Sequence, residues 1–193
     1  IFTNKINVDY NPYAKSPLID TIMNNITLSN PDLIKLLYEM IGYTLYPSNK
    51  LGKAFILTGD GANGKSTFLD IIKNLLGNKN YSSLDLKYLS DRFSTVMLYN
   101  KLANIADDIS DDFIDDTSLF KKVVTGETIT AEFKGQQRFD FTPLCKVICS
   151  TNSIPRFGKG KDAKAIGRRL IIIPFNADFS NSKDNFIGER LKD

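Results

Sequence analysis

Short apolar runs alternate along this chain with longer segments whose apolar residues recur at helical spacing. The runs have the length and composition of strands buried on both faces of a sheet, and they lie at residues 54–58, 102–106, 144–150 and 170–173. Between them, apolar residues three and four positions apart predict helices. Because buried strands alternate with helices, the pattern predicts an α/β fold with a mostly parallel central sheet covered by helices on both faces.

Two amphipathic helices are predicted ahead of the first strand. Ser16-Pro17 and Asn30-Pro31 each place a capping side chain before a proline, which suits the start of a helix. Residues 1–14 show no periodic pattern and are interpreted as irregular. We therefore expect an N-terminal helical subdomain over residues 1–50, followed by the α/β core over residues 51–193.

A β-hairpin is predicted in the second half of the chain, where polar and apolar residues alternate on both sides of the turn Lys134–Gln137. A helix is predicted before it over residues 117–124, with Gly126 as its end. Residues 78–100 are ambiguous. The remaining interpretations are a short helix from Ser90-Asp91 to Met97, an acidic loop at 109–116, a basic loop at 156–168 and a polar, partly disordered tail at 176–193.

The turn between the first strand and the following helix has a specific spacing. It fits G-x-x-x-x-G-K-[ST] at every position and reads Gly59-Asp60-Gly61-Ala62-Asn63-Gly64-Lys65-Ser66-Thr67. In a phosphate-binding loop, backbone N–H groups surround the anion and the next helix adds its positive dipole end. Lys65 would then reach the β- and γ-phosphates of ATP, and the Ser66 hydroxyl would bind Mg²⁺. The alternative is a glycine-rich turn without a ligand, but the sequence predicts that this protein binds a nucleoside triphosphate.

Polar side chains follow two other predicted strands. Asp107 and Asp108 come directly after the strand at 102–106. Asp107 would hold Mg²⁺, and Asp108 would polarise the attacking water. Asn152 follows the strand at 144–150 and would hydrogen-bond both the γ-phosphate and the water. A solvated acidic loop and an ordinary turn are the alternative interpretations of these residues.

Basic residues mark two further segments. Arg168 and Arg169 directly precede the last strand, and a guanidinium suits the delocalised charge of a phosphoryl-transfer transition state. The predicted hairpin tip carries Lys134, Gln136 and Arg138, which could follow a nucleic-acid backbone without reading its sequence. A basic strand edge on the surface and an inert exposed hairpin are the alternatives.

Composition narrows the class of protein. The 193 residues are 42% apolar and 24% charged, with a net charge of +3, which is typical of one globular core. No run approaches the 18 apolar residues of a membrane helix, so no membrane partner is expected. The absence of histidine excludes Ser-His and Cys-His nucleophiles. Cys145 and Cys149 are interpreted as buried residues in a reducing compartment. Because the chain begins at Ile1 without a methionine, we expect an excised fragment. Relative to the full-length protein, we expect truncation at both ends.

In the order of these motifs the chain resembles a superfamily III helicase, specifically the ATPase domain of phage and plasmid primase–helicases. The resemblance covers roughly residues 30–175 and rests on Ile41-Gly42-Tyr43, residues 59–67, Asp107-Asp108, Thr125-Gly126-Glu127, Ser150-Thr151-Asn152 with Pro155, and Arg168-Arg169 before Ile171–Phe175. It implies a P-loop fold of the AAA+ type with an inserted β-hairpin. It also implies an ATP hydrolase and DNA helicase that uses Mg²⁺ and forms a ring, usually a hexamer, with ATP bound between subunits.

The resemblance also implies roles for single residues. Residues 59–67 would be the Walker A motif, and Asn152 would be the sensor. Asp107 and Asp108 would be the Walker B acids, although the family commonly has Glu in the second of these positions. An arginine finger would act in trans from Arg168-Arg169, with Arg169 the better match. The hairpin would contact single-stranded or forked DNA in the central channel, through Lys134 above all. The implied setting is DNA replication beside a primase region, in the cytoplasm of a bacterial host and with a phage, plasmid or mobile-element origin.

Two other functions fit the same P-loop. A small-molecule kinase would need a lid whose arginines act in cis, which Arg156, Arg168 and Arg169 could supply, but it leaves the hairpin and Asn152 unexplained. A regulatory AAA+ module could assemble on DNA as a nucleotide switch with little turnover. The pair of acids at Asp107-Asp108 argues instead for hydrolysis.

Overall fold

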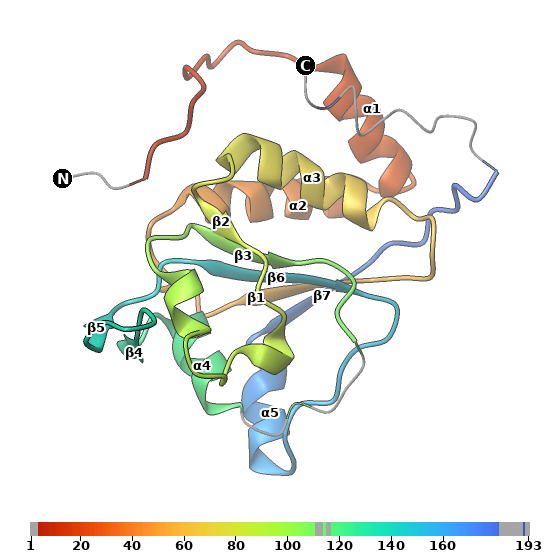
Figure 1. The fold of residues 1–193 in the computed structure, drawn as a ribbon. Helices are drawn as coiled ribbons and strands as arrows, with labels where there is room; N and C mark the ends of the chain where they lie inside the picture. Colours follow the sequence, from red (N-terminus) through yellow and green to blue (C-terminus); the bar gives the residue numbers. More distant parts are fainter. Residues whose placement is uncertain (1–3, 111–113, 115–116, 182–190, 192–193) are drawn as a thin grey trace.

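The computed structural model describes residues 4–110, 114, 117–181 and 191. Its central sheet is parallel at every pairing, with the strand order β2 (Tyr81–Ser82), β3 (Ala103–Ala106), β6 (Lys146–Thr151), β1 (Ala54–Thr58) and β7 (Leu170–Pro174). Helices cover both faces of this sheet (Figure 1). The predicted α/β fold with a mostly parallel sheet is therefore confirmed.

One face of the sheet is covered by α1 (Pro17–Ile26), α2 (Pro31–Leu45) and α3 (Lys65–Leu76). The first two helices begin as predicted, because the Ser16 and Asn30 side chains accept hydrogen bonds from backbone N–H groups of the first turn. Their apolar residues share one buried cluster with Phe55, Leu57 and the inner face of α3. The two N-terminal helices thus pack directly on the core, and the subdomain boundary at residue 50 stays a prediction.

The opposite face is covered by α4 (Ser118–Thr125), α5 (Lys161–Gly167) and two short 3₁₀ helices, η1 (Leu86–Tyr88) and η2 (Thr95–Leu98). Ala54 and Ile56 point to this face, since successive strand residues alternate. The predicted helix from Ser90 to Met97 is wrong, because Phe93 has a φ of +69° and cannot continue a right-handed helix. The basic loop at 156–168 also differs from expectation, since it contains α5.

The predicted hairpin is present as β4 (Ile129–Ala131) and β5 (Phe139–Phe141), which pair antiparallel. Only four residues separate β5 from the start of β6, so the hairpin lies beside the amino ends of the sheet strands. Figure 1 shows it at the opposite end of the sheet from the connection between β1 and α3. Both cysteines are buried and free, and among the described residues no helix is long and apolar enough to cross a bilayer.

One buried cation lies at the base of the hairpin. Lys146, the first residue of β6, is 1% exposed. Its Nζ donates hydrogen bonds to the backbone oxygens of Tyr46 and Leu144, at 2.5 and 2.7 Å, and lies 4.8 Å from the centre of the Tyr43 ring. Burial lowers the pKa of Lys146 from its ordinary value of 10.5 to about 8, partly offset by the neighbouring Cys145 thiol.

The free energy of unfolding should therefore depend on pH through Lys146, and the Lys146→Met substitution should remove that dependence. Between about pH 8 and 10.5 the unfolded chain keeps the Lys146 proton and the folded chain has released it, so a rise in pH favours the folded state. Across that window the free energy of unfolding of the wild type should rise relative to that of Lys146→Met. Urea denaturation of both proteins at several pH values measures this difference. Both proteins contain the same two cysteines, so the cysteines' contribution to the pH dependence largely cancels in the comparison. Parallel pH profiles would contradict the assignment.

Candidate active site

The loop between β1 and α3 depends on glycine at two points. Gly59 and Gly64 have φ values of +152° and +88°. A Cβ at Gly59 would lie 2.3 Å from Asn63 Nδ2 and 2.4 Å from the Phe175 oxygen, and a Cβ at Gly64 would lie 2.5 Å from Ile26 Cγ2. The neighbouring backbone and side chains therefore hold the loop in one shape, which only glycine permits at these positions.

Lys65 begins α3 and lies over this loop. Its Nζ donates hydrogen bonds to the Gly59 and Asp60 backbone oxygens at 2.5 and 3.1 Å, and to Asn63 Oδ1 at 3.0 Å. The Asn152 Oδ1 atom lies 3.5 Å from the same ammonium. Burial lowers the pKa of Lys65, and the negative charges of Asp107 and Asp108 partly offset that shift. The structure thus brings the loop lysine and the predicted amide together, although they are 87 residues apart in the sequence.

Asn63 braces the loop from inside. It is 4% exposed, and its Nδ2 donates to the Asp60 oxygen and, at 3.1 Å, to the oxygen of Phe175, the residue that follows β7. Its Oδ1 accepts from Lys65. Both ends of this amide are therefore engaged within the protein, which ties the loop to the neighbouring strand.

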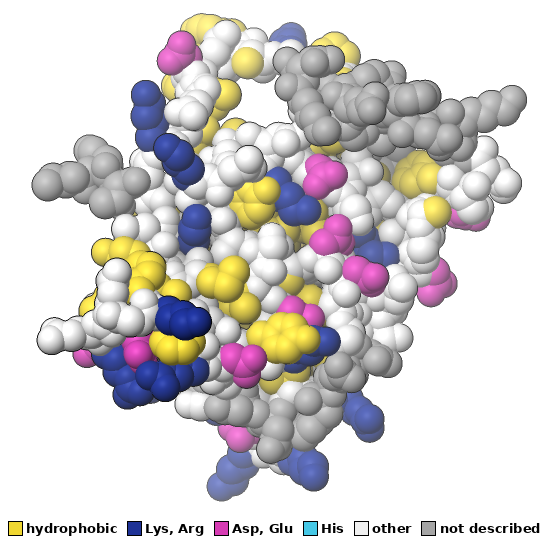
Figure 2. Space-filling model, viewed as in Figure 1, with side chains coloured by type: hydrophobic (Ala, Val, Ile, Leu, Met, Phe, Trp, Pro, Cys, Tyr) yellow, Lys and Arg dark blue, Asp and Glu magenta, His cyan; other side chains and the backbone are white. Residues whose placement is uncertain are grey.

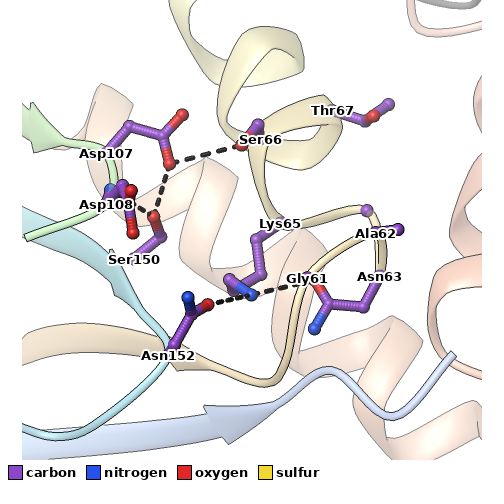
Figure 3. A pocket seen from close by; sticks show the side chains of 11 residues that line it. Gly61, Ala62, Asn63, Lys65, Ser66, Thr67, Asp107, Asp108, Ser150 and Asn152 are labelled. Atoms are coloured by element: carbon purple, nitrogen blue, oxygen red, sulfur yellow. Dashed lines mark hydrogen bonds between the residues drawn. The ribbon is translucent and has the colours of Figure 1, made fainter. Parts of the chain in front are cut away.

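The two predicted acids lie across the cavity from the loop, at the end of β3 (Figure 3). Asp107 Oδ1 accepts hydrogen bonds from Ser66 Oγ at 3.3 Å and from Ser150 Oγ. The backbone N–H of Asp108 donates to Ser150 Oγ at 2.8 Å. Asp108 has a φ of +53°, and such strain in a residue other than glycine is concentrated at functional sites. The cavity between these groups measures about 370 Å³, within the range of roughly 300–1,000 Å³ typical of small-molecule sites.

Ser150 is a site residue that the sequence interpretation did not single out. It is 1% exposed on β6, and its hydroxyl bonds the Asp107 carboxylate and the Asp108 backbone N–H. The pairing of Ala106 with Cys149 brings the end of β3 to this part of β6. The only signal in the sequence was its place beside Thr151-Asn152, at the end of a buried strand.

For the ATPase that the sequence predicts, Ser150→Ala should lower the rate of hydrolysis by about tenfold to a hundredfold while leaving ATP affinity within about threefold, because the Asp107 carboxylate and the Asp108 backbone would lose a bond that orients them while both charges remain. Steady-state kinetics and equilibrium binding measure the two effects separately. Ser153→Ala, just after the same strand, is the matched control. Unchanged turnover in Ser150→Ala would show that the hydroxyl does not position the acids.

The donor set fits one magnesium ion held jointly with phosphate. Mg²⁺ usually takes one or two protein oxygens and completes its shell with water and substrate phosphates. Ser66 Oγ and Asp107 Oδ1 are adjacent and lie at the phosphate side of the cavity. The described residues contain no group of three or more acidic or cysteine ligands that could hold a metal alone. The site therefore suits a metal that arrives with the nucleotide.

Arg168 and Arg169 lie at the amino ends of β1 and β7, whereas the loop follows the carboxyl end of β1. The Arg169 oxygen accepts from the N–H of Ala54, the first residue of β1, and Lys53 Nζ donates to the Arg168 oxygen. Since β1 runs from Ala54 to Thr58 before the loop begins, roughly 13 Å of strand separates the arginine backbones from the loop. Arg168 is exposed and Arg169 is half-buried. The structure thus does not bring these arginines to the loop of their own chain.

The hairpin tip presents cations and aromatic rings. Lys134, Gln136 and Arg138 are exposed, and Figure 2 shows basic and apolar side chains gathered at the corner of the molecule that the hairpin occupies in Figure 1. Arg138 Nε donates to Glu132 at 3.2 Å. The Phe133 ring stacks on Phe139 with centroids 5.6 Å apart and planes at 16°.

Sequence comparison places this fold in a family. The model of DUF5906, described as a family of unknown function, matches residues 57–169. That segment is more than half of the 193 residues. The chain belongs to this family. The part matched by DUF5906 contains the whole loop at residues 59–67, both acids, Ser150, Asn152 and both arginines, so the residues that surround the cavity lie within the segment that the family model matches.

Two viral proteins are relatives of this DUF5906 chain. It is 28% identical over 154 residues to "Putative helicase L207/L206" of Acanthamoeba polyphaga mimivirus, covering 72% of this chain and 15% of that protein. It is 26% identical over 137 residues to "Putative helicase 121R" of Invertebrate iridescent virus 3, covering 65% of this chain and 14% of that protein. The chain therefore spans about one seventh of the length of these relatives.

Solved structures share the fold. The apo structure of the NrS-1 C-terminal region superposes with a TM-score of 0.72 at 19% identity, over 94% of this chain and 43% of that one. The X-ray structure of JCV helicase gives a TM-score of 0.53 at 15% identity, over 90% of this chain and 51% of that one. At these identities the superpositions show that the chain shares the fold of both structures. Together with the two viral relatives, whose names read putative helicase, they support the predicted resemblance to superfamily III helicases.

Proposed function

We propose that this chain is the ATP-hydrolysing motor domain of a DNA helicase. The observation that carries the proposal is the convergence of Lys65, Ser66, Asp107 and Asn152 on one cavity above the phosphate-binding loop. In this arrangement Lys65 and the loop N–H groups bind the phosphates of ATP, and Ser66 and Asp107 hold Mg²⁺. Asp108 orients the attacking water, and Asn152 contacts the γ-phosphate. Bound Mg²⁺ would neutralise charge that develops on the phosphate oxygens.

The position of the arginines favours a shared site over a kinase. Arg168 and Arg169 lie at the amino edge of the sheet, away from their own loop. A kinase lid acts in cis, so its arginines would have to reach the loop of their own chain. An arginine finger acts in trans and reaches the loop of the neighbouring subunit instead. We therefore propose a ring, a hexamer in the full-length protein, in which these arginines complete the next subunit's site.

The strained Asp108 and the hydroxyl of Ser150 favour hydrolysis over a regulatory switch. A module that only senses ATP needs phosphate contacts, whereas hydrolysis also needs an acid oriented toward water. Ser150 Oγ accepts from the Asp108 N–H and donates to Asp107, which supports an orienting role toward the Asp107 carboxylate and the Asp108 backbone.

The hairpin is proposed to move single-stranded DNA. Its exposed Lys134 and Arg138 suit contacts with phosphates, and the rings beside them suit stacked bases.

Lys134→Ala should weaken single-stranded DNA binding several-fold and lower the salt dependence of log K by about one unit, without changing DNA-free ATPase activity. Fluorescence anisotropy at several salt concentrations measures both, with Lys35→Ala on α2 as the control. An unchanged salt slope would remove Lys134 from the DNA site.

The first test is ATP hydrolysis as a function of protein concentration, with and without single-stranded DNA. A rate that rises faster than linearly and is stimulated by DNA supports a ring motor with shared sites. A linear rate that DNA does not change contradicts shared sites in this chain. Repeating the assay with the flanking regions restored then distinguishes a missing assembly segment from a different class of P-loop protein.

The wider setting is also a proposal. The two viral relatives support an origin in a virus, plasmid or other mobile element. On the sequence resemblance, the complete protein would carry a primase region and act on forked DNA in the cytoplasm of a bacterial host.

A further inference from the structure

A second cavity lies beside the phosphate-binding loop. It measures about 420 Å³ and is bounded by the turn between α1 and α2 and by the segment that follows β7. Asn24, Asn25 and Leu28 line one side, and Asp178 and Phe179 line the other. The volume falls within the range of roughly 300–1,000 Å³ expected for a small-molecule site.

Phe179, which lines this cavity, also contacts the loop that lines the phosphate cavity. The Phe179 N–H donates to the Ala62 oxygen at 2.7 Å. The Phe179 ring lies 3.4 Å from the point where a Cβ of Gly64 would be. Ala62 and Gly64 themselves line the phosphate cavity, whose opposite side is lined by the acids and Asn152 (Figure 3). A nucleoside joined to phosphates in that cavity must leave it on the side away from the acids.

We propose that the second cavity receives the base of the bound nucleotide, with Phe179 stacking on the base and Asp178 reading its edge. This inference rests on the proposed nucleotide site. It adds the part of the ligand that the P-loop pattern cannot specify, since that pattern contacts phosphate alone. Both walls lie outside residues 57–169, so base selection would be a property of the segments that flank the family's common core.

The chemistry of the walls matches a purine with an exocyclic amino group. Leu28 and Phe179 offer apolar surface for the faces of the ring, and base–aromatic stacking is a strong, general contact. The Ser180 N–H donates to the Asp178 carboxylate at 2.8 Å and lowers its pKa. An ionised carboxylate only accepts hydrogen bonds, so Asp178 favours a base that offers an amino group. Adenine and guanine have one, whereas unsubstituted purine has neither an amino group nor an N–H on that edge.

The backbone supports the same placement. Leu28 and Ser29 have φ values of +53° and +57°, and their N–H groups donate to the Asn25 and Asn24 oxygens at 3.3 and 2.7 Å, so this left-handed turn ends α1. Leu28 is 65% exposed, so this conformation does not serve to bury its side chain in the core. It instead leaves the side chain at the edge of the cavity.

Calorimetric titration of the 193-residue chain with Mg²⁺ and either ADP or inorganic pyrophosphate separates the two cavities. The wild type should bind ADP at least about tenfold more tightly than pyrophosphate, because stacking is worth roughly an order of magnitude in affinity. Phe179→Ala should lose about tenfold for ADP and less than twofold for pyrophosphate. Phe179→Leu keeps bulk against Gly64 and should lose ADP affinity only. Asn176→Ala, an exposed neighbour outside the cavity, is the control.

A second comparison tests the role of Asp178. The wild type should prefer ADP or GDP to purine riboside diphosphate by about tenfold, as expected for a hydrogen bond to a charged group, and Asp178→Ala should remove most of that preference. Equal wild-type affinity for ADP and pyrophosphate, or a parallel loss of both in Phe179→Leu, would overturn the base site. Failure of the wild type to bind either ligand would instead refute the phosphate site on which the inference rests.

Discussion

Lys65→Ala should lower the rate of ATP hydrolysis by about 100- to 1,000-fold, the usual cost of removing one preorganised donor from a charged transition state. The Lys65 ammonium already lies among the oxygens of Gly59, Asp60 and Asn63, in reach of Asn152. Phosphate oxygens would compete for the same donors, and negative charge on them increases during transfer. A phosphate-release assay on purified protein measures the effect.

Two controls make the Lys65 result specific. Lys73→Ala lies on the same helix and loses only a partly exposed pair with Asp70, so its turnover should stay within about twofold of the wild type. Lys65→Arg keeps the charge but has a larger, planar head group and should remain strongly impaired. Retained turnover in Lys65→Ala would mean that this loop is not where ATP is hydrolysed.

The local parts of the site could be predicted from the sequence because their chemistry lies in consecutive residues. The loop at residues 59–67 carries its own spacing, and Asp107 follows a run that only a buried strand explains. Helix starts at Ser16 and Asn30 were predictable for the same reason, since a cap and a proline act within one turn.

What depended on distant contacts could not be predicted. Ser150 becomes a site residue only because β6 lies beside β3 and brings its hydroxyl to the acids. Asn63 fits the loop motif, but its bond to the Phe175 oxygen requires β7 to lie against β1. The turn at Phe93 and the seven-residue α5, which has no side-chain cap, were missed because neither carries a local signal strong enough to compete with an irregular loop.

The arginines at the amino edge of the sheet should matter only in an assembly. Arg169→Ala should keep ATP affinity within about threefold and lose about 1,000-fold or more in assembly-dependent hydrolysis, the range known for arginine fingers. Arg168→Ala is measured beside it, because Arg168 is the exposed member of the pair. Arg169 is half-buried, and its Nη1 donates to the Ala165 oxygen at 2.7 Å. Lys164→Ala, exposed on α5, is the control for a lost charge at this surface.

Mixing distinguishes a finger that acts in trans from a residue that supports its own subunit. If Arg169 completes the neighbour's site, adding Arg169→Ala protein to wild type should reduce turnover by more than simple dilution, because each mixed ring loses one shared site per variant. Lys65→Ala protein, with its arginines intact, should restore part of the activity of Arg169→Ala protein by supplying them to functional loops. The opposite result would be a loss of turnover that only follows dilution of the wild type, with no activity restored by Lys65→Ala protein. That result would mean that Arg169 acts within its own chain.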